Sequence, residues 1–324
     1  MFTNKLLVTG IGSLPYVDVE KALDKVAEYC PQLPFWPQLP KRSKQELMLE
    51  AFLFPWIKEG LVIFRHGRGI FSEKINKLDL YHNSLEKYNP LPENIAPGLY
   101  KFKEYFHKGL FTAALGVKGQ VTGPNTLSKY NLLESGLPLN HNKQILKAVL
   151  KLVQEQINFQ IDFLKELKLP LIIFIDEPAG FTNFYEPNGG ILEQGLWDLI
   201  MAARKRGVVI GIHCCNKPDW YKLSRLPVDI ISFDASNYQI TGKDKNYIID
   251  FLSTGGRIAW GIIPTSGAYW PEIHRRVVNY KDLIKMGGLI TASCGLGLST
   301  ESTVEEIMEY SKKVVELITS HKNR

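Results

Sequence analysis

Short apolar runs recur along this chain, and they constrain its fold more than any other feature of the sequence. The runs are rich in β-branched residues and bounded by Gly, Pro or Asp, which is typical of buried parallel strands. Seven such runs are clear, at residues 5–10, 112–121, 170–175, 208–212, 229–233, 257–262 and 288–292. Amphipathic segments between them predict helices at 17–29, 142–168, 192–205, 244–252, 270–286 and 303–318. This alternation predicts a parallel sheet with right-handed crossovers.

An eighth strand would close such a sheet into a barrel. Residues 60–69 contain the apolar run Leu61-Val62-Ile63-Phe64, which makes them the candidate. We therefore predict an α/β fold, a (βα)8 TIM barrel, formed by residues 1–324 as a single domain. Residues 71–95 are polar and interrupted by Asn and Pro, so we expect an excursion or lid there. An open doubly wound sheet is the alternative, but no Gly-x-Gly-x-x-Gly follows the first run.

The charge distribution argues against some classes of partner. The 324 residues include 39 basic and 33 acidic side chains, a mild excess of +6 that is scattered along the chain. Nucleic-acid binding normally leaves a clustered basic footprint, so we expect no nucleic-acid partner. No apolar stretch reaches about 18 residues, so we expect no membrane partner either. The first seven residues are too polar and too few for a signal peptide, and the expected location is cytoplasmic.

Unusual polar residues follow almost every predicted strand. The clearest are Gly12-Ser13, Asp176-Glu177-Pro178, His213-Cys214-Cys215, Asp234 and Cys294. In (βα)8 enzymes the C-terminal ends of the strands form the active-site face. These residues are therefore expected to meet around one opening.

Three of these residues make a candidate zinc site. His213 and Cys215 are separated by one residue, so in extended backbone they project to the same side. Cys294 can approach from a later strand, and three protein ligands with one open position are typical of catalytic Zn2+. We interpret Cys30 as a core residue, and Cys214, which alternates to the other side, as a core residue or a support for the metal ligands. Asp234 is a fourth ligand, an acceptor that orients His213, or a solvated or helix-capping carboxylate.

The same positions resemble a known family. Ile11-Gly12-Ser13-Leu14-Pro15, Ile175-Asp176-Glu177-Pro178-Ala179, His213-Cys214-Cys215, residues 229–236 and Ser293-Cys294-Gly295-Leu296 occur in the order of similar motifs in the C-terminal catalytic barrel of the cobalamin-independent methionine synthases. The resemblance extends from residue 10 to about residue 300. That family lies within the barrel superfamily that also contains uroporphyrinogen decarboxylase.

The resemblance implies an enzyme that transfers a methyl group from methyl-tetrahydrofolate or a methyl-corrinoid to a thiol, with homocysteine giving methionine as the favoured reaction. It implies Zn2+ held by His213, Cys215 and Cys294. By the same resemblance Asp176 would hold the amino group of homocysteine and Ser13 its amino-acid part. Glu177 would be a second substrate contact or a charge at a helix N-terminus. Asp176 and Asp234 are the candidate catalytic carboxylates.

Three departures from the family pattern bear on the methyl donor. Asp234 stands where the family has Glu. The barrel that precedes this one in the full-length enzymes and helps to bind folate is missing from the sequence, and short versions resemble zinc methyltransferases that use a corrinoid protein. The segment 261–266 also lacks the family's catalytic His, although His274 follows nearby.

Two other functions remain open from the sequence. A metal-free enzyme similar to uroporphyrinogen decarboxylase would use Arg65 and Arg68 to bind carboxylates, but it leaves His213 and the two thiols unexplained. A zinc- and thiol-binding protein without catalysis is the other alternative, motivated by Asp234 and the missing general acid.

Overall fold

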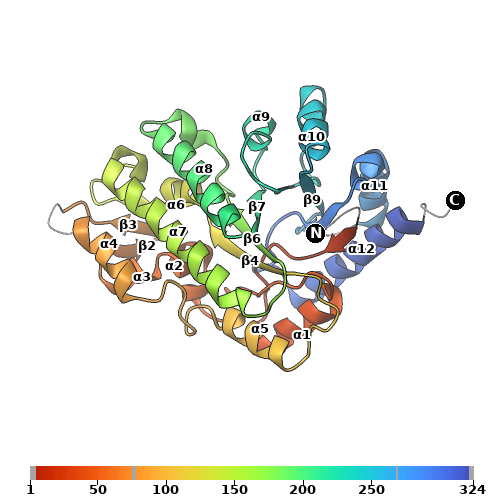
Figure 1. The fold of residues 1–324 in the computed structure, drawn as a ribbon, viewed down its shortest axis with the longest axis horizontal. Helices are drawn as coiled ribbons and strands as arrows, with labels where there is room; N and C mark the ends of the chain where they lie inside the picture. The colour runs from red at the N-terminus through yellow and green to blue at the C-terminus, as the bar shows by residue number, and fades with distance from the viewer. Residues whose placement is uncertain (1–4, 75–77, 268, 321–324) are drawn as a thin grey trace.

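A curled parallel sheet forms the centre of the computed structural model, which describes residues 5–74, 78–267 and 269–320 (Figure 1). Its seven strands correspond to the seven predicted runs. They are β1 (Leu6–Val8), β4 (Val117–Thr122), β6 (Leu171–Asp176), β7 (Val209–Cys214), β8 (Ile230–Phe233), β9 (Arg257–Ile263) and β10 (Gly288–Ala292), in the order β1-β10-β9-β8-β7-β6-β4. The order follows the chain, with β1 beside β10, so the sheet does not reverse direction as a doubly wound sheet does.

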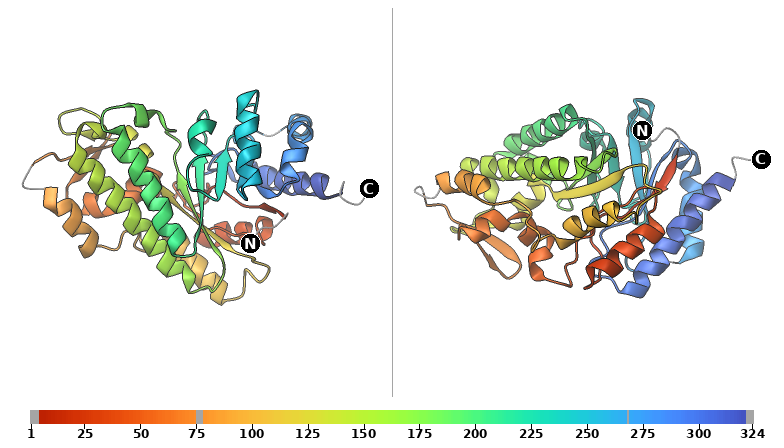
Figure 2. Two further views of the ribbon diagram at one scale, coloured as in Figure 1. Left: turned by 45° about the horizontal axis from the view of Figure 1, so that its top comes forward. Right: turned by 60° about the horizontal axis from the view of Figure 1, so that its bottom comes forward.

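Helices cover the outer face of this sheet, as the predicted alternation requires (Figures 1 and 2). The predicted helices are α1 (Val19–Tyr29), α7 (Lys143–Lys165), α8 (Gly189–Lys205), α10 (Lys243–Ser253), α11 (Trp270–Ile284) and α12 (Glu301–Ser320). Asp18 and Asn142 cap α1 and α7 by accepting backbone N–H groups of the first turn. Further helices are α2 (Met48–Phe52), α3 (Phe54–Lys58), α4 (Leu78–Lys87), α5 (Pro97–His107), α6 (Pro124–Tyr130) and α9 (Trp220–Leu223).

Alternation along each strand divides the apolar residues between two faces. In β6, Ile173 and Ile175 pack in the large core between sheet and helices, whereas Ile172 and Phe174 belong to a small cluster inside the curl. A side chain two residues beyond Phe174 therefore projects into the curl as well. That residue is Asp176, the last residue of the strand.

The strand predicted at residues 60–69 does not enter the main sheet. It forms β2 (Val62–Arg65), which pairs antiparallel with β3 (Arg68–Phe71), and β3 pairs with β5 (Leu132–Leu133) in a separate sheet. The turn residues His66 and Gly67 both have positive φ, which allows a tight hairpin instead of a crossover. Ile63 is 56% exposed, unlike the buried residues of the central strands.

Residues 34–38 lie between β4 and the end of β1, which do not pair with each other. Lys118 of β4 donates its backbone N–H to Pro34 O (2.9 Å), and Gln38 donates to Gly12 O (3.0 Å). Each side has one isolated parallel bridge, Phe35 with Lys118 and Ser13 with Gln38. The position expected for an eighth strand is thus filled by an irregular segment, and the sheet is a curled half-barrel.

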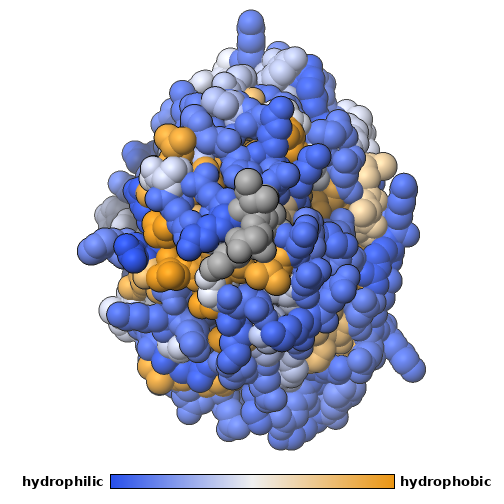
Figure 3. All heavy atoms as spheres, turned by 90° about the vertical axis from the view of Figure 1, so that its left-hand side faces the viewer, coloured by the Kyte–Doolittle hydropathy of each residue, from blue (hydrophilic) through white to orange (hydrophobic). Residues whose placement is uncertain are grey.

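The segment predicted as an excursion or lid, residues 71–95, contains the end of β3 and helix α4, while residues 75–77 of it lie outside the described part. Tyr81 of α4 is buried, contacts Trp56 edge-on and donates its hydroxyl to Leu61 O. Figure 3 shows this side of the molecule, where apolar side chains form patches between hydrophilic ones. Across the described residues, every helix is too short or too polar to cross a bilayer.

Helix α5 supports the irregular segment through a close backbone approach, which gives a test of this part of the fold. A Cβ on Gly98 would meet the carbonyl oxygen of Pro37 well inside van der Waals distance. We predict that Gly98→Ala lowers the free energy of unfolding by about 2–3 kcal/mol, because backbone must shift to admit the methyl group. Gly190→Ala is the matched control, since a Cβ at that helical position meets open space. Equal chemical-denaturation midpoints for the two variants would contradict this close packing.

Candidate metal centre and its cavity

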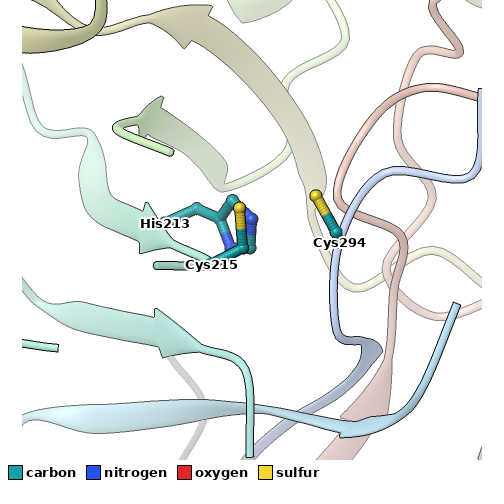
Figure 4. Close-up of side chains that lie close together, drawn as sticks. All are labelled: His213, Cys215 and Cys294. Carbon is teal, nitrogen blue, oxygen red and sulfur yellow. The ribbon is translucent and has the colours of Figure 1, made fainter. Parts of the chain in front are cut away.

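The three predicted metal ligands come together at the C-terminal ends of the strands. One ligand atom each from His213, Cys215 and Cys294 lies within 4.8 Å of the other two. His213 and Cys215 extend from the end of β7, and Cys294 approaches from the segment after β10 on the opposite side (Figure 4). Two strands separate β7 from β10 in the sheet, so the curl of the sheet brings these ends together.

Strand alternation sets the direction of His213 and Cys215, whereas Cys294 departs from it. In β7, Ile212 and Cys214 pack in the outer core, so their neighbours His213 and Cys215 point inward. Cys214 is fully buried, as expected for a core residue. In β10, Ile290 and Ala292 also face outward, and strict alternation would place Cys294 with them. The chain bends at Ser293 and Cys294 instead, which turns Cys294 toward β7.

His213 is held in one orientation by its neighbour in the sheet. Its Nδ1 lies 2.9 Å from Ser232 Oγ, and the two residues are register partners across β7 and β8. The other ring nitrogen, Nε2, is buried and has no hydrogen-bond partner among the described residues. A buried, unpartnered imidazole nitrogen is costly unless a ligand uses its lone pair.

The two thiols act as an unequal pair. A hydrogen bond from Cys215 lowers the pKa of the Cys294 thiol to about 4, and His213 also lowers it while burial opposes the change. The same hydrogen bond and burial raise the pKa of Cys215. A thiolate is the form of cysteine that binds metal, so the lowered pKa of Cys294 favours metal binding.

This donor set fits zinc. One imidazole and two sulfurs are preferred Zn2+ ligands, and Zn–N and Zn–S bonds of about 2.0 and 2.3 Å place tetrahedral ligands about 3.5–3.8 Å apart. Ligand atoms within 4.8 Å need only small side-chain adjustments to reach that spacing. The unpartnered His213 Nε2 is the nitrogen that would bind.

A cavity of about 520 Å³ opens beside the three ligands, a size suited to a small molecule. His213, Cys294, Asp176 and Ser13 all line it, together with Gln38, Glu46, Thr265 and an apolar wall that includes Ile11, Met48 and Leu298. The structure therefore brings two of the predicted substrate-binding residues to the cavity that the metal ligands border.

Asp176 and Ser13, which both line the cavity, differ in their hydrogen-bond partners. Asp176 lines the cavity, and its Oδ1 is buried without a hydrogen-bond partner among the described residues. Burial raises the pKa of Asp176 to about 6, opposed by His213 and Lys118. Ser13 Oγ accepts the backbone N–H of Gly297 (3.1 Å), which ties the first strand end to the segment carrying Cys294.

Glu177 and Asp234 lie outside the cavity lining. Glu177 is buried and accepts hydrogen bonds from the backbone and side chain of both Asn125 and Thr126, at the start of α6. This arrangement matches the interpretation of Glu177 as a charge at a helix N-terminus. Asp234 accepts from the backbone and side chain of Ser236 and Asn237, so it caps its own turn, and His213 has Ser232 as its partner instead.

Lys118 was not predicted as a site residue. It is completely buried, points inside the curl and donates to Ile11 O (2.6 Å), next to the Gly12-Ser13 turn. Burial lowers the pKa of Lys118 to about 8, while the charge of Asp176 opposes that change. A lysine within the mostly apolar run 112–121, where it is the one charged residue, was the signal in the sequence that could have identified it.

The residues proposed for other functions lie apart from the cavity. Arg65 and Arg68 are exposed on the β2–β3 hairpin and do not line it. His274 is exposed on α11, where its ring lies against Trp270. Neither the decarboxylase alternative nor a general-acid role for His274 has support from this geometry.

The partner of His213 gives a second testable prediction. We expect Ser232→Ala to weaken zinc binding by about 10- to 100-fold, because the ring loses the hydrogen bond that orients it. Competition with a coloured chelator measures this change. Asp234→Asn is the comparison, since that residue was the sequence-based candidate for the same role. A larger loss of affinity in Asp234→Asn than in Ser232→Ala would contradict the assignment.

Comparison with known proteins yields only distant similarity. No protein-family model matches the chain, and no curated protein matches it. Among solved structures, a putative vitamin-B12-independent methionine synthase from Listeria monocytogenes matches with a TM-score of 0.43 and 17% identity, over 63% of this chain and 64% of that chain. The chain thus spans less than two thirds of the length of that protein.

Glycosidases match at a similar level. The GH20 catalytic module of a pneumococcal exo-β-D-N-acetylglucosaminidase has a TM-score of 0.48 and 12% identity, over 97% of this chain and 83% of that chain. A Podospora anserina GH26–CBM35 mannanase has a TM-score of 0.42 and 13% identity, over 95% and 61%. Likenesses at this level carry no argument about activity, so any assignment of function depends on the site itself.

Proposed function

We propose that this protein is a zinc-dependent methyltransferase that methylates a small thiol, with homocysteine as the favoured acceptor and methionine as the product. The observation that carries the proposal is the convergence of His213, Cys215 and Cys294 at the edge of a small-molecule cavity. The donor set has three protein ligands, which is typical of a catalytic zinc site with one position left for an exchangeable ligand.

The acceptor thiol is the group that the metal would activate. A free thiol has a pKa of about 8.5 and is mostly protonated at neutral pH. Zinc chemistry would supply deprotonation of that thiol while its sulfur stays nucleophilic. The reaction then forms a sulfur–carbon bond, breaks the bond between methyl group and donor, and leaves the electron pair of the broken bond on the donor.

The protein's own residues would bind and orient the acceptor. Asp176 lines the cavity and has one oxygen without a hydrogen-bond partner among the described residues, so its carboxylate would suit the ammonium group of an amino acid. Ser13 lines the same cavity, at a turn where a hydroxyl and backbone N–H groups suit a carboxylate. Holding the amino acid at both groups would direct its sulfur toward His213 and the two cysteines.

For the methyl donor, methyl-corrinoid and methyl-tetrahydrofolate both remain proposals. The apolar wall of the cavity includes Leu298, which is 86% exposed, and Leu47, which is 37% exposed. Exposed apolar side chains at a cavity entrance favour contact with the flat face of a large ring. Both donors carry such a ring, so the identity of the donor is a matter for assay.

The test combines metal analysis with an activity assay. We expect purified protein to contain about one zinc ion per chain and to methylate homocysteine from one of the two donors. A panel with other small thiols defines the acceptor. Zinc and tight thiol binding without turnover on either donor would favour the non-catalytic alternative. A protein without stoichiometric zinc that cannot be loaded with it would overturn the proposal.

A further inference from the structure

A second cavity lies away from the three metal ligands, between α11 and the loop after β8. It has a volume of about 750 Å³, and it is lined by Ser236, Asn237 and Gln239 from the loop and by Arg275, Arg276 and Asn279 from the helix. The lining is dominated by hydrogen-bonding groups and carries two guanidinium groups. No carboxylate side chain of the described residues lines it.

The walls of this cavity are fixed to each other. The backbone N–H of Ile240 donates to the hydroxyl of Tyr280 (3.2 Å), which joins the loop to α11. The ring of Tyr280 stacks on the buried Trp260 of β9, with ring centroids 5.7 Å apart. On the loop side, Asp234 holds Ser236 and Asn237 in place through their backbone and side-chain groups. The hydrogen bonds and ring contacts within the protein therefore preform the cavity.

Arg276 has a donor that the protein leaves unused. Its Nη1 is buried and has no hydrogen-bond partner among the described residues. Its nearest anionic group is Glu272, with Nη2 and Oε2 3.7 Å apart, which is longer than a hydrogen bond. A buried cationic N–H group without an acceptor is costly, and an oxyanion is the ligand that relieves this cost most fully.

We propose that this cavity binds an oxyanionic group, a phosphate or a carboxylate, of a small-molecule ligand. Arg276 would meet two oxygens with its planar guanidinium group, and Arg275 would supply the second positive charge. Ser236, Asn237 and Asn279 would contribute neutral hydrogen bonds around the anion. Two carboxylates lie near this site. Asp234 already accepts four hydrogen bonds, and Glu272, one turn before Arg276 on α11, is half exposed to solvent.

The experiment is titration calorimetry at low ionic strength with inorganic phosphate in one arm and glutarate in the other. We expect at least one of them to bind, and the tighter one identifies the chemical class of the ligand. Arg276→Gln should weaken that binding by about tenfold or more, which corresponds to the loss of a charge-assisted hydrogen bond. Arg275→Glu, at an exposed position, is a second variant and should weaken that binding as well.

Two controls separate this site from others. Arg65→Gln/Arg68→Gln removes two exposed positive charges on the β2–β3 hairpin and should leave the affinity unchanged. Cys294→Ala alters the metal centre and should also leave it unchanged, so the result is independent of the proposed methyltransferase activity. Absence of binding in both arms, or equal losses in the hairpin variant and in Arg276→Gln, would overturn the proposal. Loss of binding in Cys294→Ala would likewise overturn it, by placing the anion in the first cavity.

Discussion

Cys294→Ala is expected to reduce the zinc content of the purified protein from about one ion per chain to a small fraction, and to abolish methyl transfer. Removing one of three ligands leaves His213 and Cys215, a pair that cannot hold a tetrahedral ion firmly. We expect activity to fall by about a thousandfold or more, since without the metal the acceptor thiol stays mostly protonated.

Cys214→Ser is the matched control for this experiment. Cys214 is adjacent to Cys215 in sequence, yet it faces the outer core and its thiol lies 3.7 Å from the carbonyl oxygen of Asn216. Serine preserves its size and its hydrogen-bond donor, so zinc content should be unchanged. Elemental analysis and the methyl-transfer assay are performed on both proteins. Full zinc content in Cys294→Ala would disprove the assignment of the metal site.

Glu177→Ala is expected to lower the free energy of unfolding by about 3 kcal/mol, without a direct effect on the cavity. The carboxylate is completely buried and accepts four hydrogen bonds from Asn125 and Thr126. Alanine would leave the two backbone N–H groups at the start of α6 without acceptors. Burial raises the pKa of Glu177 to about 7, so these four donors offset part of a considerable desolvation cost.

Urea unfolding at constant pH measures this effect, and Glu104→Ala is its control. Glu104 pairs with Lys101 and Lys108 on the surface of α5, where an ion pair contributes little to stability. We expect a much smaller change there. Zinc content per folded Glu177→Ala chain should stay normal, because the residue has no contact with the ligand atoms. Unchanged stability together with lost substrate binding would instead support a substrate contact for Glu177.

Much of the fold could be predicted from the sequence because each central strand is a distinct apolar run. All seven predicted runs became strands of one parallel sheet, and the six predicted helices are present with small changes at their ends. The eighth strand was wrong, because Leu61-Val62-Ile63-Phe64 has the composition of a buried strand but folds back at His66-Gly67. The segment that fills the gap, residues 34–38, contains two prolines, Pro34 and Pro37, and is followed by Pro40, so it lacked any strand signal.

Some features of the candidate site were likewise predictable from the sequence, and others were not. Local alternation within one strand predicted that His213 and Cys215 share a side and that Cys214 faces away, since neighbours two apart point alike in any strand. Ser232, the partner of His213, was not identified, because strand register between β7 and β8 is a property of the sheet. The buried Lys118 was missed as well, although it stood out in an apolar run.

The sequence by itself identified the residues that we propose for the chemistry and the strand end that each one follows, because periodicity and composition are local properties. Only the tertiary structure decided that Cys294 turns inward against the alternation of β10. It also decided that Asp176 lines a cavity, whereas Glu177 accepts hydrogen bonds at the start of α6. The position of two arginines of α11 in the lining of a second cavity was likewise a tertiary outcome. These outcomes depend on how strongly the sheet curls and which loops pack across it. Both are set by contacts between segments that are distant in sequence, such as Glu177 with Thr126 and Ile240 with Tyr280, and no local pattern encodes them.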